Sequence, residues 1–572
     1  MNKNLKQIFV AFSRNQNLNR TAVSRSFSNY IHSTKLTDNS TNRFKEKLDS
    51  GPSLVNFLQN DQPQLSQIQE KHSDVPYIEE LTNFQRKVYF DIYGCQMNVN
   101  DIEIVWSILK ENKFERTLNL VEADVILLMT CSIRESAEEK IWGRLDYIRG
   151  LKKVRRKDRP SLKVGILGCM AERLKEKVLE KESMVDLVAG PDSYRHLPRL
   201  LSLTENNQKS INVLLSLDET YADITPVRLN ENSISAFVSI MRGCDNMCTY
   251  CIVPFTRGRE RSRPIASILG EVENLSKQGV KELTLLGQNV NSYRDISSDN
   301  KIDNITTLAS GFKTVYKPKK GGLRFSDLLR KVAEVDSEMR IRFTSPHPKD
   351  FPDDVIETIR MYPNICKNLH MPAQSGNTAV LERMRRGYTR EAYIDLIKHI
   401  RNLIPDVALS SDFICGFCGE TDEEFEDTVS LMNEIKYNTA FLFPYSMREK
   451  TTAHRRYQDN VPADIKQKRL ENMIQVFRHH AEKLNRSQIG KKHLVLIEGY
   501  SKRSKSFLQG RNDHNIRVIV PSEHVPDKNG NNLRDLKPGD YVAVRVNDAN
   551  SQTLRAVPLY TTSLKDFCLE DM

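Results

Sequence analysis

Residues 243–251 read GCDNMCTYC, which places Cys244, Cys248 and Cys251 in one short loop. Gaps of three and then two residues let this loop fold back, so that its three thiolates point at one small object. Thiolates are soft ligands that suit iron–sulfur clusters or zinc. Three thiolates leave the fourth position of a four-coordinate site open, and catalytic metal sites keep such an open position. The loop therefore predicts a reactive metal centre, with a partial zinc knuckle or a disulfide pair beside a spare thiol as alternatives.

The loop resembles the cluster loop of radical S-adenosylmethionine (radical SAM) enzymes, in which an aromatic residue, here Tyr250, precedes the last cysteine. The resemblance implies a [4Fe-4S] cluster on the three cysteines, with SAM bound to the fourth iron. It also implies reductive cleavage of SAM to a 5'-deoxyadenosyl radical that abstracts hydrogen from the substrate. In such an enzyme the cofactor supplies the radical chemistry, and the protein supplies position and shielding.

Length and charge narrow the class of protein. A chain of 572 residues predicts three or four domains. No apolar run approaches the roughly 18 to 20 residues that cross a bilayer, so we expect a soluble enzyme without a membrane partner. The net charge of +11 and pI near 9.0 favour a nucleic-acid partner. Ten cysteines are too sparse for a disulfide scaffold and fit reduced, metal-binding thiols better.

Residues 1–37 contain six Lys or Arg and no Asp or Glu, together with several Ser. This composition is typical of a mitochondrial transit peptide and predicts a location in the matrix. The alternative is a disordered tail that carries no targeting signal. Residues 38–84 are polar and aperiodic and predict a disordered linker.

Residues 85–205 alternate apolar runs with helical patterns. This order predicts a flavodoxin-like parallel sheet with right-handed crossovers. The predicted strands are 87–93, 123–129, 163–167 and 185–189, and the predicted helices are 99–111, 133–149 and 172–180.

One cysteine follows each of the first three predicted strands: Cys95, Cys131 and Cys169. The loops after parallel strands converge outside the carboxyl edge of the sheet, where open α/β sheets bind ligands. We therefore expect these thiols to be neighbours in space. The alternative is three separate buried cysteines that act as small hydrophobic residues.

The three loops read GCQMN at residues 94–98, TCSIRE at 130–135 and GCMAER at 168–173. They resemble the cluster loops of the methylthiotransferases, in particular the MiaB type, which acts on isopentenylated adenosine of tRNA. The resemblance implies a second [4Fe-4S] cluster on Cys95, Cys131 and Cys169. It spans about residues 85–560, and it implies that SAM is also a cofactor in a second role, as a methyl donor.

The implied reaction converts the C2–H bond of the adenine next to the tRNA anticodon to C2–S–CH3. One SAM would donate a methyl group to sulfur held at the second cluster, and another would yield the radical that activates C2. Acid–base chemistry cannot readily activate that C–H bond, which is why a radical is needed. An adenosine in the anticodon loop can be splayed out and inserted into a pocket.

Residues 230–462 contain six strand-like runs separated by helical stretches, which fit an open (βα)6 partial TIM barrel of radical SAM type. The cysteine loop follows its first strand at the C-terminal mouth, where barrel sites lie. The predicted strands are 236–241, 282–286, 341–343, 368–370, 407–414 and 440–443, with helices at 268–278, 325–335 and 390–403.

Polar residues and one glycine gather after the later strands of this domain. The resemblance implies that some of them hold SAM or substrate, while the alternative is that each satisfies a loop backbone group. Gly287 would let a ligand or backbone come close. The predicted cofactor-binding residues are Tyr250, Gly287, Gln288, Ser345 and Gln374.

The run RGRERSR at residues 257–263 follows the cysteine loop directly. Arginine forks suit phosphate or carboxylate, so Arg257, Arg261 and Arg263 are predicted contacts of the tRNA backbone or of the SAM carboxylate. A solvated or cross-paired surface run is the alternative. Residues 295–321 form a polar, Lys-rich insertion and predict a surface loop.

A helix at 463–489 leads to residues 490–560, where apolar strands at 493–497, 516–520, 541–546 and 554–557 alternate with turns. A small basic β-barrel suits backbone binding of RNA. This segment resembles the TRAM domain of RNA-modifying enzymes, with Arg511 in a recurrent turn as a predicted RNA contact. A barrel that merely packs on the catalytic domain is the alternative, and residues 561–572 are predicted to be a tail.

The sequence thus predicts a SAM-dependent transferase that acts on tRNA, and on mitochondrial tRNA if residues 1–37 are a leader. A reductase or ferredoxin-type electron donor and a sulfur source are the further partners that the resemblance implies. Eukaryotic members of this branch also carry the name of a protein associated with a cyclin-dependent-kinase regulatory subunit, which the residues neither support nor exclude as a partner. Two alternatives stay open: a methylthiotransferase of a ribosomal protein, and a non-catalytic kinase-regulator binding protein with structural clusters.

Overall fold

The computed structural model describes residues 86–132, 135–156, 158–205, 208–297, 311–313, 321–530 and 532–570. All of these belong to one unit, Pro76–Met572. The predicted transit peptide and the linker lie outside the described residues, as does most of the 295–321 insertion.

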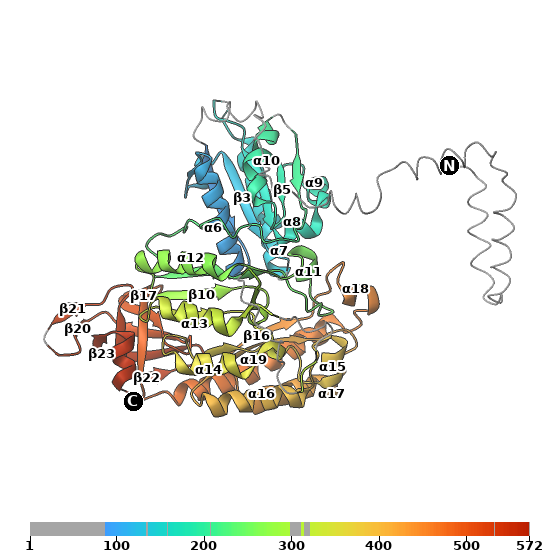
Figure 1. The fold of residues 1–572 in the computed structure, drawn as a ribbon. Coiled ribbons are helices and arrows are strands. Elements are labelled where there is room, and N and C mark those ends of the chain that lie inside the picture. Colours follow the sequence, from blue (N-terminus) through green and yellow to red (C-terminus); the bar gives the residue numbers. More distant parts are fainter. Residues whose placement is uncertain are drawn as a thin grey trace, which may run out of the picture. The chain divides into compact units, whose positions relative to one another are not determined.

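The N-terminal part is a parallel sheet with the strand order β2-β1-β3-β4-β5-β6, shown in blue and cyan in Figure 1. Its first five strands have the 2-1-3-4-5 order of doubly wound sheets such as flavodoxin. Every residue of β3 and β4 is buried, because helices cover both faces of the sheet. The strands are β1 Lys87–Ile92, β2 Glu115–Arg116, β3 Val125–Thr130, β4 Lys163–Gly168, β5 Leu187–Ala189 and β6 Ser210–Asn212.

The helices of this part confirm the predicted alternation. The predicted helix at 172–180 is divided, because Lys175 adopts a φ of +52° and separates α8 from α9. The elements are α6 Gln96–Glu111, η1 Leu120–Glu122, α7 Glu135–Lys153, α8 Cys169–Leu174, α9 Glu176–Lys181, η2 Tyr194–His196 and α10 Leu197–Glu205.

The central part contains all six predicted strands, in two parallel sheets of three strands each. The first has the order β13-β10-β7 and the second the order β14-β15-β16, and a single parallel bridge, Ile341 to Ile365, leads from β13 toward β14. The strands are β7 Ser235–Ser239, β10 Glu282–Leu286, β13 Arg340–Phe343, β14 Asn368–His370, β15 Ala408–Cys415 and β16 Thr439–Pro444.

The helices of the central part follow the strands in chain order and lie along their outer side (Figure 1). Helix α17 shows how the sequence starts such a helix: Thr421 Oγ1 accepts the Glu424 N–H at 3.2 Å, and Glu424 Oε2 accepts the Thr421 N–H at 3.1 Å. The main helices are α12 Ile265–Lys277, α13 Phe325–Val335, α14 Asp353–Met361, α16 Arg390–Leu403 and α17 Asp422–Ile435.

Shorter elements complete the central part around the strand ends. They are β8 Met241–Arg242, α11 Val253–Thr256, β9 Arg261–Ser262, η3 Val290–Ser292, β11 Arg294–Asp295, β12 Leu323–Arg324, η4 Pro348–Asp350, α15 Thr378–Arg383 and α18 Thr452–Arg456.

Of the insertion at 295–321, residues 295–297, 311–313 and 321 are described, and most of these are exposed, so the surface loop stays a prediction. Strands β11 and β12 pair antiparallel and close its base. Phe312 is buried, with its ring centroid 5.1 Å from that of Tyr388, and the Lys313 N–H donates to the Gly387 carbonyl at 2.7 Å. Phe312 is buried because its aromatic side chain has a large apolar surface, which is more stable away from water.

The C-terminal part is a closed barrel with the strand order β17-β18-β19-β23-β22, drawn in red in Figure 1. Helix α19, Ala463–Arg486, leads into it as predicted. The sequence did not predict β18, whose residues SKSFLQGR are mostly polar. The elements are β17 Lys492–Ser501, β18 Ser504–Arg511, β19 Arg517–Pro521, β20 His524–Pro526, β21 Leu533–Asp535, β22 Tyr541–Ala549, β23 Thr553–Thr562 and α20 Leu564–Glu570.

Residues 561–572 are not a simple tail, because β23 extends to Thr562 and α20 follows it. Leu564 is buried with Leu494, Leu496 and Tyr541. At the other end of α20, Glu570 pairs with Lys492 and Lys528.

The barrel docks on the central part through two arginines of β13. Arg340 donates to the Leu494 carbonyl at 2.7 Å and the Arg511 carbonyl at 2.8 Å. Arg342 donates to the Asn512 carbonyl at 2.8 Å and the Asp513 carbonyl at 2.9 Å. The barrel therefore packs on the central part, while Arg517 and Arg555 of its strands are exposed.

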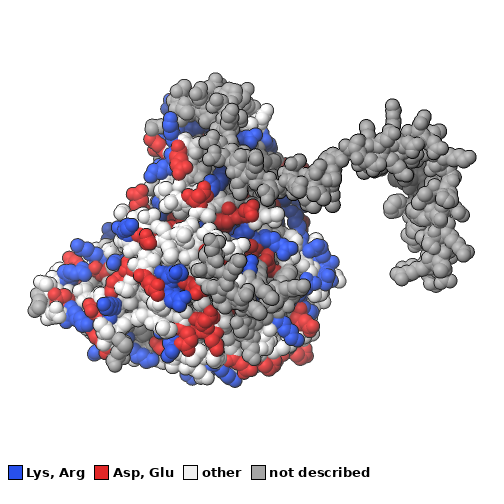
Figure 2. Space-filling model, viewed as in Figure 1, with Lys and Arg blue, Asp and Glu red and all other residues white. Residues whose placement is uncertain are grey.

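On the face drawn in Figure 2, basic and acidic side chains are interspersed. The net positive charge therefore does not mark a nucleic-acid surface there by itself. Among the described residues, no helix is both long and apolar enough to cross a bilayer.

Candidate active site

The three cysteines of the N-terminal sheet lie at its carboxyl edge. Cys95 follows β1 and precedes α6, Cys131 follows β3, and Cys169 begins α8 directly after β4. Asn98 Nδ2 donates to the Tyr93 carbonyl at 2.6 Å and to the Thr130 carbonyl at 3.1 Å. Thr130 Oγ1 in turn donates to the Leu167 carbonyl at 2.5 Å. These bonds tie the three loops together.

The thiols of these loops are close to one another and to one arginine. A hydrogen bond from Cys131 lowers the pKa of the Cys95 thiol to about 6, against the effect of burial. Arg257 Nε donates to Cys169 Sγ at 3.2 Å. Burial raises the pKa of Cys169, and Arg257 opposes that rise. The first three cysteines are thus neighbours, with a cation among them.

The loop that carries Cys244, Cys248 and Cys251 is held at both ends. Strands β8 and β9 pair before and after it, with Arg242 opposite Arg261. Gly243 has a φ of +77°, and a side chain there would collide with the backbone of Arg259, so glycine is required. The Gly243 N–H donates to Gln288 Oε1 at 2.6 Å, which connects the loop to the end of β10.

This loop places its thiols in a low-dielectric environment. Burial raises the pKa of Cys251 to about 12 and holds the pKa of Cys244 well above its usual value. Arg386 Nη1 lies 3.5 Å from Cys248 Sγ as a donor. Thiols in such a place become ligating thiolates when a cationic group neutralises them.

These residues fit the iron–sulfur clusters that the family resemblance implies. All ten cysteines lie in the described part, and none of them forms a disulfide there. Within the described ranges, no group of three or more His, Cys, Asp or Glu side chains is arranged to hold a single metal ion. Iron–sulfur clusters take thiolates at separate irons rather than at one point. The soft donor set, its burial and the adjacent guanidiniums suit an anionic cluster.

A buried carboxylate joins the two groups of cysteines. Asp101, in α6, accepts from Arg242 Nη1 at 2.8 Å and from Arg257 Nη2 at 2.7 Å. Although burial alone would raise the pKa of Asp101, these guanidiniums hold it below its usual value. Arg257 Nη2 also donates to Asn98 Oδ1 at 3.3 Å.

Sequence reasoning did not identify Asn98, Asp101 or Arg386. The signal for the first two was present, because both lie on the buried face of α6, within six residues of Cys95. Polar residues on an apolar helix face are informative when they are buried. Arg386 follows α15 and carries no recognisable pattern.

The predicted cofactor-binding residues lie in loops after successive strands. Gln288 follows β10, Ser345 follows β13 and Gln374 follows β14. Ser345 and Gln374 have φ values of +56° and +71°, in the left-handed region that non-glycine residues adopt uncommonly. A Cβ on Gly287 would collide with the side chain of Met241, and Tyr250 packs against the hydrophobic cluster formed by Val380, Met384, Phe417, Cys418, Tyr445 and Ala453.

Three of the four predicted RNA contacts are buried ion pairs, so that prediction is corrected. Arg257 pairs with Asp101, Arg261 with both oxygens of Asp192 at 3.0 and 3.1 Å, and Arg263 with Glu271 at 2.7 Å. In residues 257–263, buried arginines stand beside exposed Arg259, and the sequence does not distinguish the two kinds. Arg511 is partly exposed and stays a prediction.

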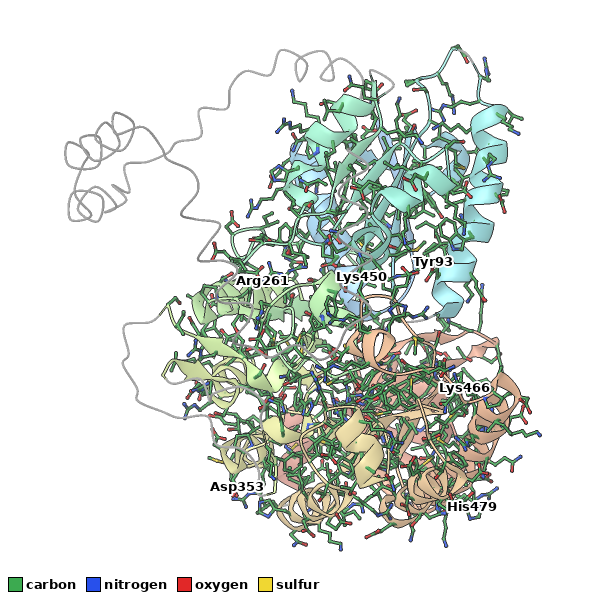
Figure 3. All side chains as sticks on the ribbon, turned by 90° about the vertical axis from the view of Figure 1, so that its right-hand side faces the viewer. Tyr93, Arg261, Asp353, Lys450, Lys466 and His479 are labelled. Carbon is green, nitrogen blue, oxygen red and sulfur yellow. The ribbon has the colours of Figure 1, made fainter. Side chains whose placement is uncertain are left out.

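Figure 3 labels Arg261, Tyr93 and Lys450 where the N-terminal and central parts meet. Lys450 Nζ donates to the Arg173 carbonyl at 3.1 Å across this seam. At this seam, Arg257 of the central part contacts Cys169 of the N-terminal part.

Family models match three successive parts of the chain. Residues 87–190 match the Uncharacterized protein family UPF0004, residues 238–432 match the Radical SAM superfamily, and residues 486–559 match the TRAM domain. Fold and site therefore define a radical SAM enzyme with a C-terminal TRAM domain.

The chain is similar to whole proteins as well. It is 58% identical to the "Mitochondrial tRNA methylthiotransferase CDK5RAP1" of Mus musculus, over 91% of this chain and 90% of that protein. It is 56% identical to the protein of the same name from Homo sapiens, over 92% and 91%. It is 49% identical to the "tRNA-2-methylthio-N(6)-dimethylallyladenosine synthase" of Porphyromonas gingivalis, over 82% and 94%. The chain belongs to the family of radical SAM tRNA methylthiotransferases, which confirms the predicted family.

Proposed function

We propose that this protein adds a 2-methylthio group to N6-isopentenyladenosine next to the anticodon of tRNA, in the mitochondrial matrix. One observation carries the proposal. Arg257, which follows the Cys244–Cys251 loop, contacts Cys169 of the other cysteine group at 3.2 Å. Sulfur insertion needs the two groups side by side. The names of the mouse and bacterial relatives support the substrate, and that of the mouse relative supports the location.

The two groups of cysteines would hold separate [4Fe-4S] clusters, one on Cys244, Cys248 and Cys251 together with SAM, and one on Cys95, Cys131 and Cys169. When bound, the first supplies the radical that an unreactive C–H bond requires, and the second holds sulfur for transfer. The chain's own residues orient these groups. Asn98 fixes the loops of Cys95 and Cys131, and Arg386 donates to Cys248. A ferredoxin-type or reductase electron donor and a sulfur source complete the system.

For SAM and substrate we propose the loops after β10, β13 and β14, with Gln288, Ser345 and Gln374. The positive φ values of the latter two support this role, because strained backbone concentrates at functional sites. For Tyr250 and Gly287 we propose a role in shaping the wall of the SAM site. We also propose that the six central strands form one open barrel, which the Ile341–Ile365 bridge supports. The domains would then be 85–205, 230–462, the connecting helix 463–489, and 490–560.

For the tRNA backbone we propose the outer face of the TRAM barrel. Arg511 of β18 lies directly opposite Arg517 of β19, and Arg555 of β23 lies opposite Ile519 of β19. Arg511 pairs with Glu498 at 3.1 Å, while Arg517 and Arg555 are exposed. Exposed guanidiniums on one face suit the phosphate backbone of RNA.

The test is modification of defined substrates by the anaerobically reconstituted full chain with SAM, a reductant and sulfide. Isopentenylated tRNA, the same tRNA without the isopentenyl group, and ribosomal proteins are compared by mass spectrometry. We expect 2-methylthio nucleoside from isopentenylated tRNA, together with 5'-deoxyadenosine. Methylthiolation of a ribosomal protein alone, or absence of 5'-deoxyadenosine, would contradict the proposal and favour one of the two alternatives.

A further inference from the structure

Two arginines stand at the ends of the loop that carries Cys244, Cys248 and Cys251. Arg242 lies two residues before Cys244, and Arg257 lies six residues after Cys251. Both reach the same carboxylate: Arg242 Nη1 donates to Asp101 Oδ1 at 2.8 Å, and Arg257 Nη2 donates to Asp101 Oδ2 at 2.7 Å. Exposed fractions of 1%, 0% and 3% for Arg242, Asp101 and Arg257 show that water does not replace these bonds.

The carboxylate belongs to the other cysteine group. Asp101 lies in α6, the helix that starts directly after Cys95, and Asn98 in the same helix braces the loops of Cys95 and Cys131. Arg257 also donates through Nε to Cys169 Sγ. One carboxylate therefore connects both ends of the first cysteine loop to the scaffold of the second group.

Removing the charge of Asp101 would leave Arg257 buried without a carboxylate partner, and it would leave Arg242 with only Glu219, at 3.7 Å. Buried ion pairs add little net stability compared with apolar packing, and their best-attested role is to fix register. Two nitrogens of this set, Arg257 Nη1 and Arg242 Nη2, are inaccessible and have no hydrogen-bond partner among the described residues. Arg257 Nη1 is thus a spare donor beside Cys169, of the kind that a sulfur atom of a bound cluster accepts.

We propose that Asp101 is a positioning residue that sets the separation of the two cysteine groups, by clamping both ends of residues 243–256. The inference rests on the proposed two-cluster function. Asp101 does not contact the reacting atoms. Its loss lets the cysteine loop shift against Cys169 while each group of cysteines keeps its own ligands.

The test uses Asp101→Asn in the full chain, with Glu271→Gln as a matched control. Glu271 is a buried partner of Arg263, and its loss also leaves a guanidinium unpaired, but away from the cysteine loop. Pulsed electron paramagnetic resonance of the reduced protein measures the dipolar coupling between clusters. Asp101→Asn should bind as much iron as the wild type, with changed coupling, and its ratio of 5'-deoxyadenosine to methylthio product should rise by on the order of a hundredfold. Glu271→Gln should match the wild type in both.

Wild-type coupling and a wild-type product ratio in Asp101→Asn would overturn the proposal. If that variant does not fold, Arg242→Gln keeps the Asp101–Arg257 pair and releases only the upstream end of the loop. Unchanged coupling in that folded variant would equally overturn it.

The proposed function can fail separately from the clamp. Amide hydrogen exchange of residues 243–256 in the cofactor-free full chain needs neither cluster nor tRNA. The clamp predicts faster exchange of this segment in Asp101→Asn than in Glu271→Gln. Equal exchange would overturn the clamp, whereas absence of methylthio product from the wild type would overturn only the function.

Discussion

Gly287 lies so close to Met241 that a Cβ on it would be 2.5 Å from Met241 Cγ. We therefore expect Gly287→Ala to lower the free energy of unfolding by about 1–3 kcal/mol through overpacking. Gly270→Ala, in α12 with open space around it, should instead raise that energy by up to about 1 kcal/mol.

Chemical denaturation of both variants and of Gly287→Ala combined with Met241→Ala checks this account. The loss in the double variant should be smaller than the sum of the two single losses, because the shorter side chain at position 241 leaves room for the new methyl group. Strict additivity, with SAM binding lost in Gly287→Ala, would point instead to a contact with the cofactor.

His514 of the barrel lies 3.0 Å from Asp406 of the central part. Although burial disfavours the charged ring, the hydrogen bond to Asp406 raises the pKa of His514. The folded protein therefore holds this proton more tightly than the unfolded chain, where a His pKa is about 6.5. The resulting stability is fully present below about pH 6.5 and is lost as pH rises through the raised folded pKa.

Thermal unfolding of wild type and His514→Gln at about pH 5.5 and pH 8.5 tests this linkage. The difference in midpoint between the two proteins should be larger at the lower pH. A difference that is the same at both values would refute a protonated His514–Asp406 pair.

For single residues, the sequence predicts spatial neighbours where the topology of the fold fixes their positions. Cys95, Cys131 and Cys169 were predictable as neighbours because each follows a parallel strand, and parallel strands end at one edge. Arg257, Arg261 and Arg263 were not predictable in the same way. Asp101 and Asp192, the partners of Arg257 and Arg261, come from the N-terminal part of the chain, and local pattern carries no information about such pairing. Glu271, the partner of Arg263, lies eight residues further on, in α12.

At the scale of elements, helix α20 closes the C-terminal barrel. Leu564 is 3% exposed among Leu494, Leu496 and Tyr541, and its N–H donates to Glu338 of the central part at 2.8 Å. Leu564→Ala should lower the free energy of unfolding by about 2–5 kcal/mol. Leu569→Ala, at a position 55% exposed, should change it by no more than about 0.5 kcal/mol. Equal effects in a denaturation series would show that α20 is not docked.

The outer face of the barrel makes a separate prediction. Arg517→Gln and Arg555→Gln should each weaken tRNA binding and reduce the slope of log affinity against log salt by about 1. Lys398→Gln, an exposed residue of α16 beside Glu434, is the control and should leave the slope unchanged. Titration of labelled tRNA at several salt concentrations measures this, and unchanged slopes in the arginine variants would exclude this face.

Elements with a strong apolar period were predictable, and short or polar ones were not. Helices α13 and α16 begin and end where the sequence predicts. Strands β2 and β6 have two and three residues, too few for a period to be visible. Strand β18 was missed because the barrel shape, and not its own residues, makes it a strand.

At the scale of the whole molecule, the seam between the N-terminal and central parts brings the cysteines together. Asp101 and Asp192 come from the first part, and Arg242, Arg257 and Arg261 come from the second. The sequence predicts each part by itself, because each has its own core and its own alternation of strands and helices. It does not predict their seam, since the ion pairs of Asp101 and Asp192 join residues 69 to 156 positions apart that carry no shared motif.

The proposed function depends on two groups of three cysteines that each hold an iron–sulfur cluster. Iron and sulfide analysis after anaerobic reconstitution tests it most directly, in three proteins: wild type, Cys95→Ala/Cys131→Ala/Cys169→Ala, and Cys244→Ala/Cys248→Ala/Cys251→Ala. We expect about eight irons per wild-type chain and about four in each triple variant, with 5'-deoxyadenosine formed only where Cys244, Cys248 and Cys251 are intact. About four irons in the wild type, unchanged by loss of Cys95, Cys131 and Cys169, would contradict it.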